Sequence, residues 1–153
     1  MEGPMEPSQA CYDLVEKSEA FESHPYPDPV GIPTIGYGCT HYPDGTRVTL
    51  HDAPIDEATG HAMMVYAMAP IAALVAHYVQ VKLTQNEFDA LCDFAYNEGP
   101  QKLKTSTLLA KLNAHDFDGA AAEFKKWIYA DGRIYQGLVT RREAERKLFL
   151  GIQ

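Results

Sequence analysis

The sequence predicts an α+β fold that is mainly helical, with a small antiparallel β-sheet near the N-terminus. Its 153 residues are 46% hydrophobic and 22% charged, as expected of a globular chain with a buried core. Four prolines between residues 25 and 33 fix φ and remove backbone donors, so no helix continues there. Beyond residue 56, apolar residues recur at helical spacing to the end of the chain.

The first predicted helix starts at Ser8, which has the side chain of an N-cap. Residues 11–15 give it an apolar face, and the helix reaches either Glu19 or Glu22. Spacing from Val15 puts Glu22 nearer the middle of the apolar stripe and Glu19 on its flank. Periodicity therefore leaves both glutamates open.

Short extended segments are predicted from Pro33 to Leu50. The turn sequence Pro43-Asp44-Gly45 stands between Ile35–Tyr37 and Arg47–Thr49. We expect these two segments to pair as the small antiparallel sheet.

The next helical pattern starts at Asp56 or Thr59 and runs through Val79, and Pro70 should kink it or split it in two. Its most apolar run, residues 62–76, is shorter than the roughly 20 residues that span a bilayer. We therefore expect a core helix and no stable membrane insertion.

The remaining helices are predicted from their start and stop signals. The start signals are Thr84-Gln85-Asn86-Glu87, Thr105-Ser106-Thr107, Asp116 and Thr140-Arg141-Arg142-Glu143. The first and last of these are capping boxes. The apolar stripe after Asp116 runs to Ile128, and Gly99-Pro100 and Gly151 are stop signals.

Two carboxylates and a hydroxyl stand around the proline-rich segment: Glu19, Asp28 and Thr34, spaced as Glu-x8-Asp-x5-Thr. The segment resembles the catalytic region of the phage-type lysozymes (endolysins, glycoside hydrolase family 24). The pattern is matched by Glu19, by Tyr26-Pro27-Asp28 and by Gly31-Ile32-Pro33-Thr34-Ile35-Gly36-Tyr37-Gly38. The resemblance extends over roughly residues 12 to 150, and it favours Glu19 over Glu22 as the catalytic glutamate.

Breaking a glycosidic bond needs an acid that protonates the leaving oxygen and a carboxylate that activates water or acts as nucleophile. The resemblance implies Glu19 as the acid, Asp28 as the carboxylate, and Thr34 as the hydroxyl that holds water against Asp28. The implied reaction is hydrolysis of the β-1,4 bond between N-acetylmuramic acid and N-acetylglucosamine in bacterial peptidoglycan. An inverting mechanism is implied too, with the carboxyl groups roughly 6.5 to 9.5 Å apart.

Other site residues come from the same resemblance. Arg142 is the cationic partner expected to approach the catalytic glutamate from the last helix. Four residues match positions that line the saccharide cleft: Thr40, Tyr96, Asn97 and Thr107. The implied fold is lysozyme-like and forms a single domain over residues 1–153. Its N-terminal lobe covers about residues 8–55 and its helical C-terminal lobe about residues 56–153. A long helix joins the two lobes.

The sequence departs from the family pattern at two positions. Ala20 stands where the family usually has a glycine after the catalytic glutamate, so the turn there is open to a different backbone shape. Cys39 stands where family members often carry a histidine. We expect Cys39 to be a small buried hydrophobic side chain rather than a reactive thiol.

Composition limits the partners and the compartment. A net charge of -8 argues against nucleic acid as a ligand. Three cysteines exclude a full disulfide framework, and the first residues have no signal-peptide pattern. The six histidines have no ligand spacing and no cofactor motif is present, so we expect no metal and no cofactor.

The resemblance implies lysis of a bacterial host by a bacteriophage. A monomer that accumulates in the host cytoplasm and needs a holin to reach the wall is the expected form. Two alternatives remain. The first is a lytic transglycosylase on a related fold, which has one acid/base glutamate and no water-holding aspartate. The second is an inactive peptidoglycan-binding or regulatory protein in which Ala20 and Cys39 mark lost catalysis.

Overall fold

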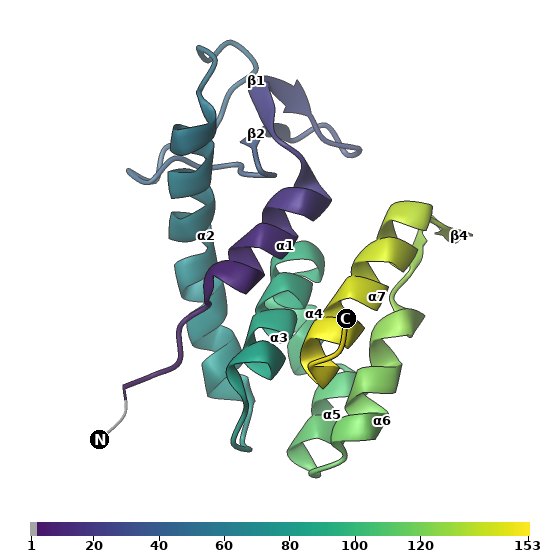
Figure 1. Cartoon of the computed structure of the whole chain (residues 1–153). Helices are drawn as coiled ribbons and strands as arrows, with labels where there is room; N and C mark the ends of the chain where they lie inside the picture. Colours follow the sequence, from purple (N-terminus) through teal and green to yellow (C-terminus); the bar gives the residue numbers. More distant parts are fainter. Residues whose placement is uncertain (1–2) are drawn as a thin grey trace. The chain divides into compact units, whose positions relative to one another are not determined.

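The computed structural model describes residues 3–153, which form two compact units (Figure 1). The hairpin unit is Val15–Pro70, and the helical unit joins Met1–Leu14 to Ile71–Gln153. Both boundaries fall inside helices, α1 (Gln9–Glu19) and α2 (Glu57–Tyr78). The boundaries of the two units therefore differ from those of the predicted lobes, residues 8–55 and 56–153. The predicted fold class, mainly helical with small antiparallel sheets, is confirmed.

The sheet of the hairpin unit is made by β1 (Glu22–Pro27) and β2 (Pro33–Gly36), which pair antiparallel. Tyr26 stands opposite Thr34, and Pro27 stands opposite Pro33. A sheet of two strands has two open edges, so prolines without an N–H group can be placed where no ladder bond is lost. The proline-rich segment is therefore extended, as predicted, and is itself one of the two strands.

The predicted pairing of Ile35–Tyr37 with Arg47–Thr49 is wrong. Gly36 and Gly38 have φ of 66° and 80°, and this left-handed backbone turns the chain directly after β2. Ile35 and Cys39 then exchange backbone hydrogen bonds of 2.9 Å across the turn. The later segment forms only an isolated bridge between His41 and Arg47.

Helix α2 begins after Asp56, whose Oδ1 accepts a hydrogen bond of 2.7 Å from the N–H of Thr59. It continues through Pro70 for 22 residues without splitting, so the predicted split did not occur. Within residues 3–153, α2 is the one helix long and apolar enough to cross a membrane, by length and composition only. One third of its apolar window is buried, and core helices of soluble proteins meet the same criterion. The absence of membrane insertion stays a prediction.

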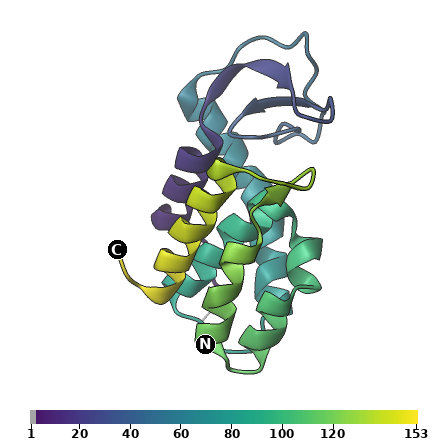
Figure 2. The same cartoon turned by 90° about the vertical axis from the view of Figure 1, so that its right-hand side faces the viewer.

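The helical unit is built mainly from helices (Figure 2). In chain order they are α3 (Gln85–Glu98), α4 (Pro100–Lys104), α5 (Thr107–Asn113), α6 (Phe117–Glu123), a 3₁₀ turn (Phe124–Lys126) and α7 (Gln136–Leu150). Helix α7 packs along α3, and α5 packs against α6. The capping box at Thr84, the cap at Asp116 and the left-handed stop at Gly151 are confirmed.

Three features of the helical unit differ from the prediction or were not predicted. Helix α7 starts at Gln136, so Thr140 and Glu143 lie inside it and form no capping box. The apolar stripe after Asp116 leaves the α-helix at Glu123. A two-residue hairpin, β3 (Tyr129–Ala130) with β4 (Arg133–Ile134), turns through residues 131–132, both at positive φ.

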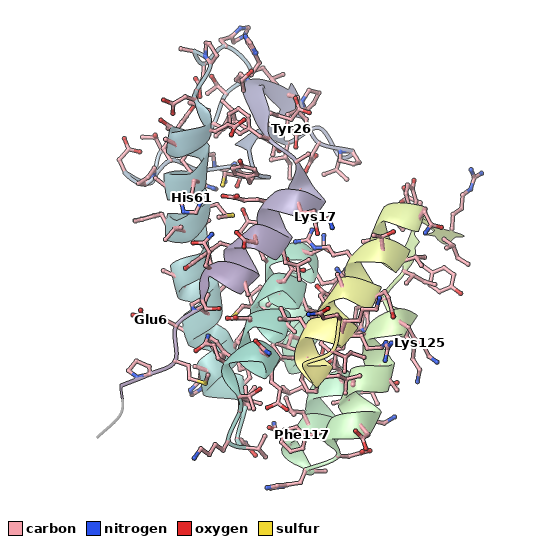
Figure 3. The ribbon with its side chains drawn as sticks, viewed as in Figure 1. Glu6, Lys17, Tyr26, His61, Phe117 and Lys125 are labelled. Carbon is pink, nitrogen blue, oxygen red and sulfur yellow. The ribbon has the colours of Figure 1, made fainter. Side chains whose placement is uncertain are left out.

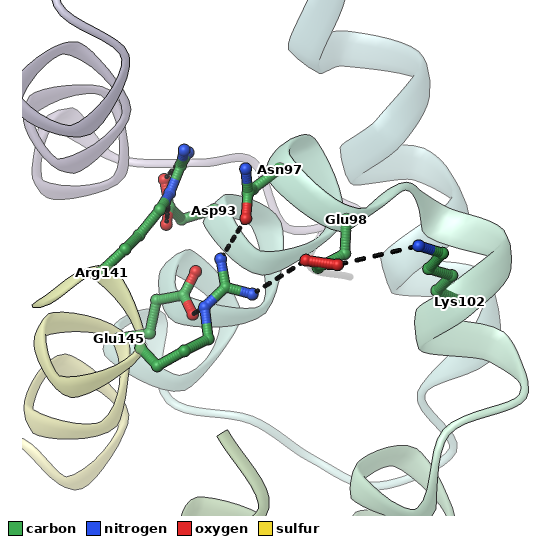
Figure 4. Close-up of polar contacts among 7 residues, drawn as sticks. Asp93, Asn97, Glu98, Lys102, Arg141 and Glu145 are labelled. Carbon is green, nitrogen blue, oxygen red and sulfur yellow. Dashed lines mark hydrogen bonds and ion pairs between the residues drawn. The ribbon is translucent and has the colours of Figure 1, made fainter. Parts of the chain in front are cut away.

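Buried charges tie α7 to α3 (Figure 4). Arg141 donates two hydrogen bonds to Asp93, from Nε to Oδ2 at 2.9 Å and from Nη2 to Oδ1 at 2.8 Å. Arg142 lies 2.9 Å from Glu145 through Nε and 3.7 Å from Glu98 through Nη1. Such pairs are taken out of water, so removing one partner leaves the other charge without compensation.

Two guanidinium groups thus face three carboxyl groups, of which Asp93 and Glu145 are fully buried. Burial raises the pKa of Glu145 well above its usual value, and the neighbouring Asp93 raises it further, while Arg142 opposes the shift. A proton on Glu145 leaves two guanidinium groups against two charged carboxylates.

The raised pKa predicts a pH-dependent loss of stability. Above about pH 4.5 an unfolded Glu145 releases its proton whereas the folded protein retains it, so the free energy of unfolding falls as pH rises. Glu145→Gln removes this component. Urea unfolding at pH 5 and pH 8 should show a smaller loss of stability in Glu145→Gln than in the unsubstituted protein. Parallel pH dependences would show that Glu145 is ionised in the folded state.

Candidate active site

Glu19 is the last residue of α1, half-buried where the helix ends. The N–H of Ala20 closes the helix with a hydrogen bond of 3.0 Å to the carbonyl of Glu16, and Ala20 then takes φ of 57°. This is the left-handed conformation that a glycine adopts most readily at a helix end. Ala20 therefore keeps the backbone shape of a glycine turn, with some strain.

The carboxylate of Glu19 lies against Gly38. A Cβ atom built on Gly38 would lie 3.0 Å from Glu19 Oε2, and φ at Gly38 is 80°. A larger residue at this position would push the carboxylate away and strain the backbone. Gly38 thus fixes where the Glu19 carboxylate can lie, which explains one glycine of the matched pattern.

Asp28 organises the turn between β1 and β2. Its Oδ1 accepts hydrogen bonds of 2.9 Å from the N–H groups of Val30 and Ile32. The carbonyl of Ile32 in turn accepts the N–H of Asp28 and the hydroxyl of Thr34, both at 2.9 Å. Oδ2 makes no hydrogen bond or ion pair with any residue from 3 to 153, so one carboxylate oxygen of Asp28 holds the loop and the other remains available.

Tyr26 projects from the first strand of the hairpin (Figure 3). It is half-buried on β1, opposite Thr34. Burial raises the pKa of Tyr26, and the charges of Glu19, Glu22 and Asp28 raise it further. The phenol therefore keeps its proton more firmly than an exposed tyrosine does. Sequence reasoning used Tyr26 as part of a motif but gave it no role.

The other predicted residue of the hairpin unit is Thr40, half-buried next to the bridge that follows β2. Its hydroxyl lies 2.9 Å from Nδ1 of His41. Cys39 beside it is buried, as predicted. No group of three or more His, Cys, Asp or Glu within the described part of the chain is arranged to hold a metal ion.

Tyr96, Asn97 and Thr107 belong to the helical unit. Tyr96 and Asn97 are half-buried in the last turn of α3, and Thr107 is exposed as the first residue of α5. Asn97 accepts a hydrogen bond from Nη2 of Arg142 through Oδ1. A guanidinium group only donates, so the amide oxygen must face it and the NH₂ group points away (Figure 4).

Arg142 is buried, and all three of its nitrogens contact groups of the helical unit. Besides Asn97, it faces Glu98 and Glu145, and its Cζ lies 5.0 Å from the centre of the Phe94 ring. Burial lowers the pKa of Arg142, while Glu145 and Glu98 oppose the shift. The structure thus gives Arg142 the position of a support for Asn97, and its approach to Glu19 stays a prediction.

A carboxyl group at a helix end and a second one in the hairpin that follows supply the two residue types that glycoside hydrolases use in catalysis. The family model described as phage lysozyme matches residues 16–145. An endolysin of Bacillus phage B103 is 41% identical over 149 residues, which cover 94% of this chain and 53% of that protein. This chain belongs to the phage lysozyme family.

Two further comparisons agree. An endolysin of Acyrthosiphon pisum secondary endosymbiont phage 1 is 37% identical over 140 residues, covering 89% of this chain and 92% of that protein. The solved structure of an endolysin from Escherichia coli O157:H7 phage FAHEc1 has a TM-score of 0.88 at 31% identity, covering 98% of this chain and 96% of that one. The resemblance found in the sequence is confirmed, and the chain spans about half the length of the Bacillus phage protein.

Removing Arg142 should destabilise the protein strongly. Arg142→Ala removes a buried guanidinium group from Glu98, Asn97 and the Phe94 ring, and we expect a loss of about 3–5 kcal/mol in the free energy of unfolding, measured with urea. Arg146→Ala is the matched control on the same helix, since Arg146 and its partner Glu143 are only half-buried. Equal losses in both variants would contradict the argument from burial.

The turn at Ala20 gives a prediction of opposite sign. Ala20→Gly removes the strain of a positive φ and should raise the free energy of unfolding by about 0.5–1 kcal/mol. Ala73→Gly, on the exposed face of α2, should lower it by about the same amount because a helical glycine costs backbone entropy. A loss of stability in both variants would mean that Ala20 is not strained.

Proposed function

We propose that this protein hydrolyses the β-1,4 bond between N-acetylmuramic acid and N-acetylglucosamine in bacterial peptidoglycan. One observation carries the proposal: Asp28, in the hairpin turn that follows the helix ending at Glu19, holds the loop through Oδ1 and leaves Oδ2 without a partner among residues 3–153. Family membership supports it, since lysozymes and endolysins are the relatives that this chain matches.

The proposed reaction uses both carboxyl groups at once. Glu19 gives its proton to the glycosidic oxygen as the bond to the anomeric carbon breaks, and Asp28 takes a proton from the water that attacks that carbon. The Thr34 hydroxyl already donates to the carbonyl of Ile32, so toward a water it acts as an acceptor. A water that donates one hydrogen to Thr34 and the other to Asp28 Oδ2 keeps a lone pair for the sugar. Attack from the face opposite the leaving group inverts the anomeric centre.

Four further residues are proposed, from the family pattern, to bind saccharide: Thr40 in the hairpin unit and Tyr96, Asn97 and Thr107 in the helical unit. The NH₂ group of Asn97 is a donor whose orientation is set by Arg142. Hydroxyl and aromatic groups suit saccharides. We further propose that the enzyme works as a monomer in phage-induced lysis, reaching the wall from the host cytoplasm through a holin-dependent route.

Two observations bear on the alternatives. Ala20 keeps the left-handed turn that a glycine would make, and Cys39 is buried, so neither departure disrupts the backbone around Glu19. This favours an active enzyme over an inactive binding protein. Asp28 has an unengaged carboxylate oxygen beside Thr34, which favours hydrolysis over a transglycosylase reaction that needs no water-holding aspartate.

Substitution of the two carboxylates tests the mechanism. Glu19→Gln and Asp28→Asn should each lower the rate of clearing of permeabilised cells by about 10²-fold or more, because each removes one proton-transfer partner. Glu22→Gln is the matched control, since Glu22 is exposed on β1 and has no assigned role. Full activity in Glu19→Gln with loss in Glu22→Gln would transfer the acid role to Glu22.

Analysis of the products separates the reaction types in the same experiment. Mass spectrometry of digested peptidoglycan should show free reducing ends, and proton NMR of the fresh products should show the α-anomer, as inversion requires. Anhydro-muramoyl products would identify a transglycosylase instead.

A further inference from the structure

We propose that the hydroxyl group of Tyr26 is a substrate-binding donor of this site, which hydrogen-bonds an oxygen of the saccharide held between Glu19 and Asp28. The inference rests on the glycosidase function proposed above and adds a residue to it. All the groups that carry it belong to the hairpin unit.

The register of the sheet puts Tyr26 on the catalytic face. Directly paired residues of an antiparallel sheet point to the same side, so the side chains of Tyr26 and Thr34 share one face. Asp28 follows directly after β1, and its N–H donates to the carbonyl of Ile32, which also accepts the hydroxyl of Thr34. The hairpin therefore presents the phenol and the Thr34 side chain on one face, next to the turn that holds Asp28.

The Tyr26 hydroxyl has no protein partner. Across residues 3–153 it makes no hydrogen bond or ion pair, although the side chain is half-buried. Half-buried tyrosine hydroxyl groups usually find a partner, and other tyrosines here do: that of Tyr42 donates to Asp52 at 2.7 Å. A hydroxyl that contributes nothing to the fold is left for a ligand.

The charges around Tyr26 define what it can do. Burial and the neighbouring carboxylates raise its pKa, so the phenol keeps its proton and remains a donor at any pH at which the enzyme works. A neutral donor avoids repulsion with Glu19, Glu22 and Asp28, and it does not form the tight ion pair that a lysine would make with Glu19. Saccharide hydroxyl and N-acetyl oxygens are neutral acceptors that match such a donor.

The binding test uses an inactive background so that turnover does not interfere. Glu19→Gln is titrated calorimetrically with a soluble tetrasaccharide of alternating N-acetylmuramic acid and N-acetylglucosamine, with and without Tyr26→Phe. We expect Tyr26→Phe to raise the Kd about 3- to 10-fold, the effect of one neutral hydrogen bond. Tyr66→Phe, an exposed tyrosine of α2, is the control and should leave the Kd unchanged.

The same variants distinguish the possible failures. No binding of the tetrasaccharide by Glu19→Gln would overturn the proposed function itself, whereas equal binding with and without the Tyr26 hydroxyl would overturn only the inference. Thermal unfolding is the second readout, because a hydroxyl without a protein partner should leave the melting temperature of Tyr26→Phe unchanged. A clear fall in that temperature would show a structural role for the hydroxyl and contradict the inference.

Discussion

The carbonyl of Ile32 holds the catalytic hairpin together. It accepts both the N–H of Asp28 and the hydroxyl of Thr34, while Asp28 accepts the N–H of Ile32 in return. Three residues are thereby fixed by one small set of hydrogen bonds in a loop that has no helix to support it. The prolines on both strands restrict the chain before it folds, so less conformational entropy is lost when this turn forms. The position of the proposed base and its threonine is thus a property of the turn.

The uneven distribution of charge explains how an acidic protein can suit a glycan. Val15–Pro70 contains eight acidic and two basic residues, whereas the helical unit contains eleven basic and thirteen acidic ones. The glycan backbone at the scissile bond is recognised by neutral donors and acceptors, so an acidic hairpin unit does not repel it as it would a phosphate chain. The basic residues lie mainly in the helical unit, whose charge is therefore closer to balance.

Local signals in the sequence predicted the elements whose causes are local. The capping box at Thr84 and the cap at Asp116 act within four residues, and both were found where the sequence placed them. The pairing of β2 with β1 was missed because it depends on the turn at Asp28, and a Pro-Asp-Gly turn at residues 43–45 is the more common hairpin signal. Thr140 has the residues of a capping box inside a helix, since packing of α7 on α3 extends that helix beyond its local signal. The hairpin residues of the candidate site followed from one matched pattern, whereas the contacts of Arg142 and the role inferred for Tyr26 needed coordinates.

Positioning in the two units is achieved by different physical means. In the hairpin unit, Gly38 limits the place of the Glu19 carboxylate by close approach, and hydrogen bonds to the backbone fix Asp28. In the helical unit, buried charge fixes Asn97, because Arg142 can face its amide only through the oxygen and is itself held by Glu98 and Glu145. Changing Gly38 should therefore disturb the chemistry while leaving the α3–α7 contact intact. Changing Glu145 should affect the stability of that contact and the orientation of Asn97 before it affects proton transfer. Catalysis and glycan binding can in this way be altered separately, since the groups that position each belong to different parts of the chain.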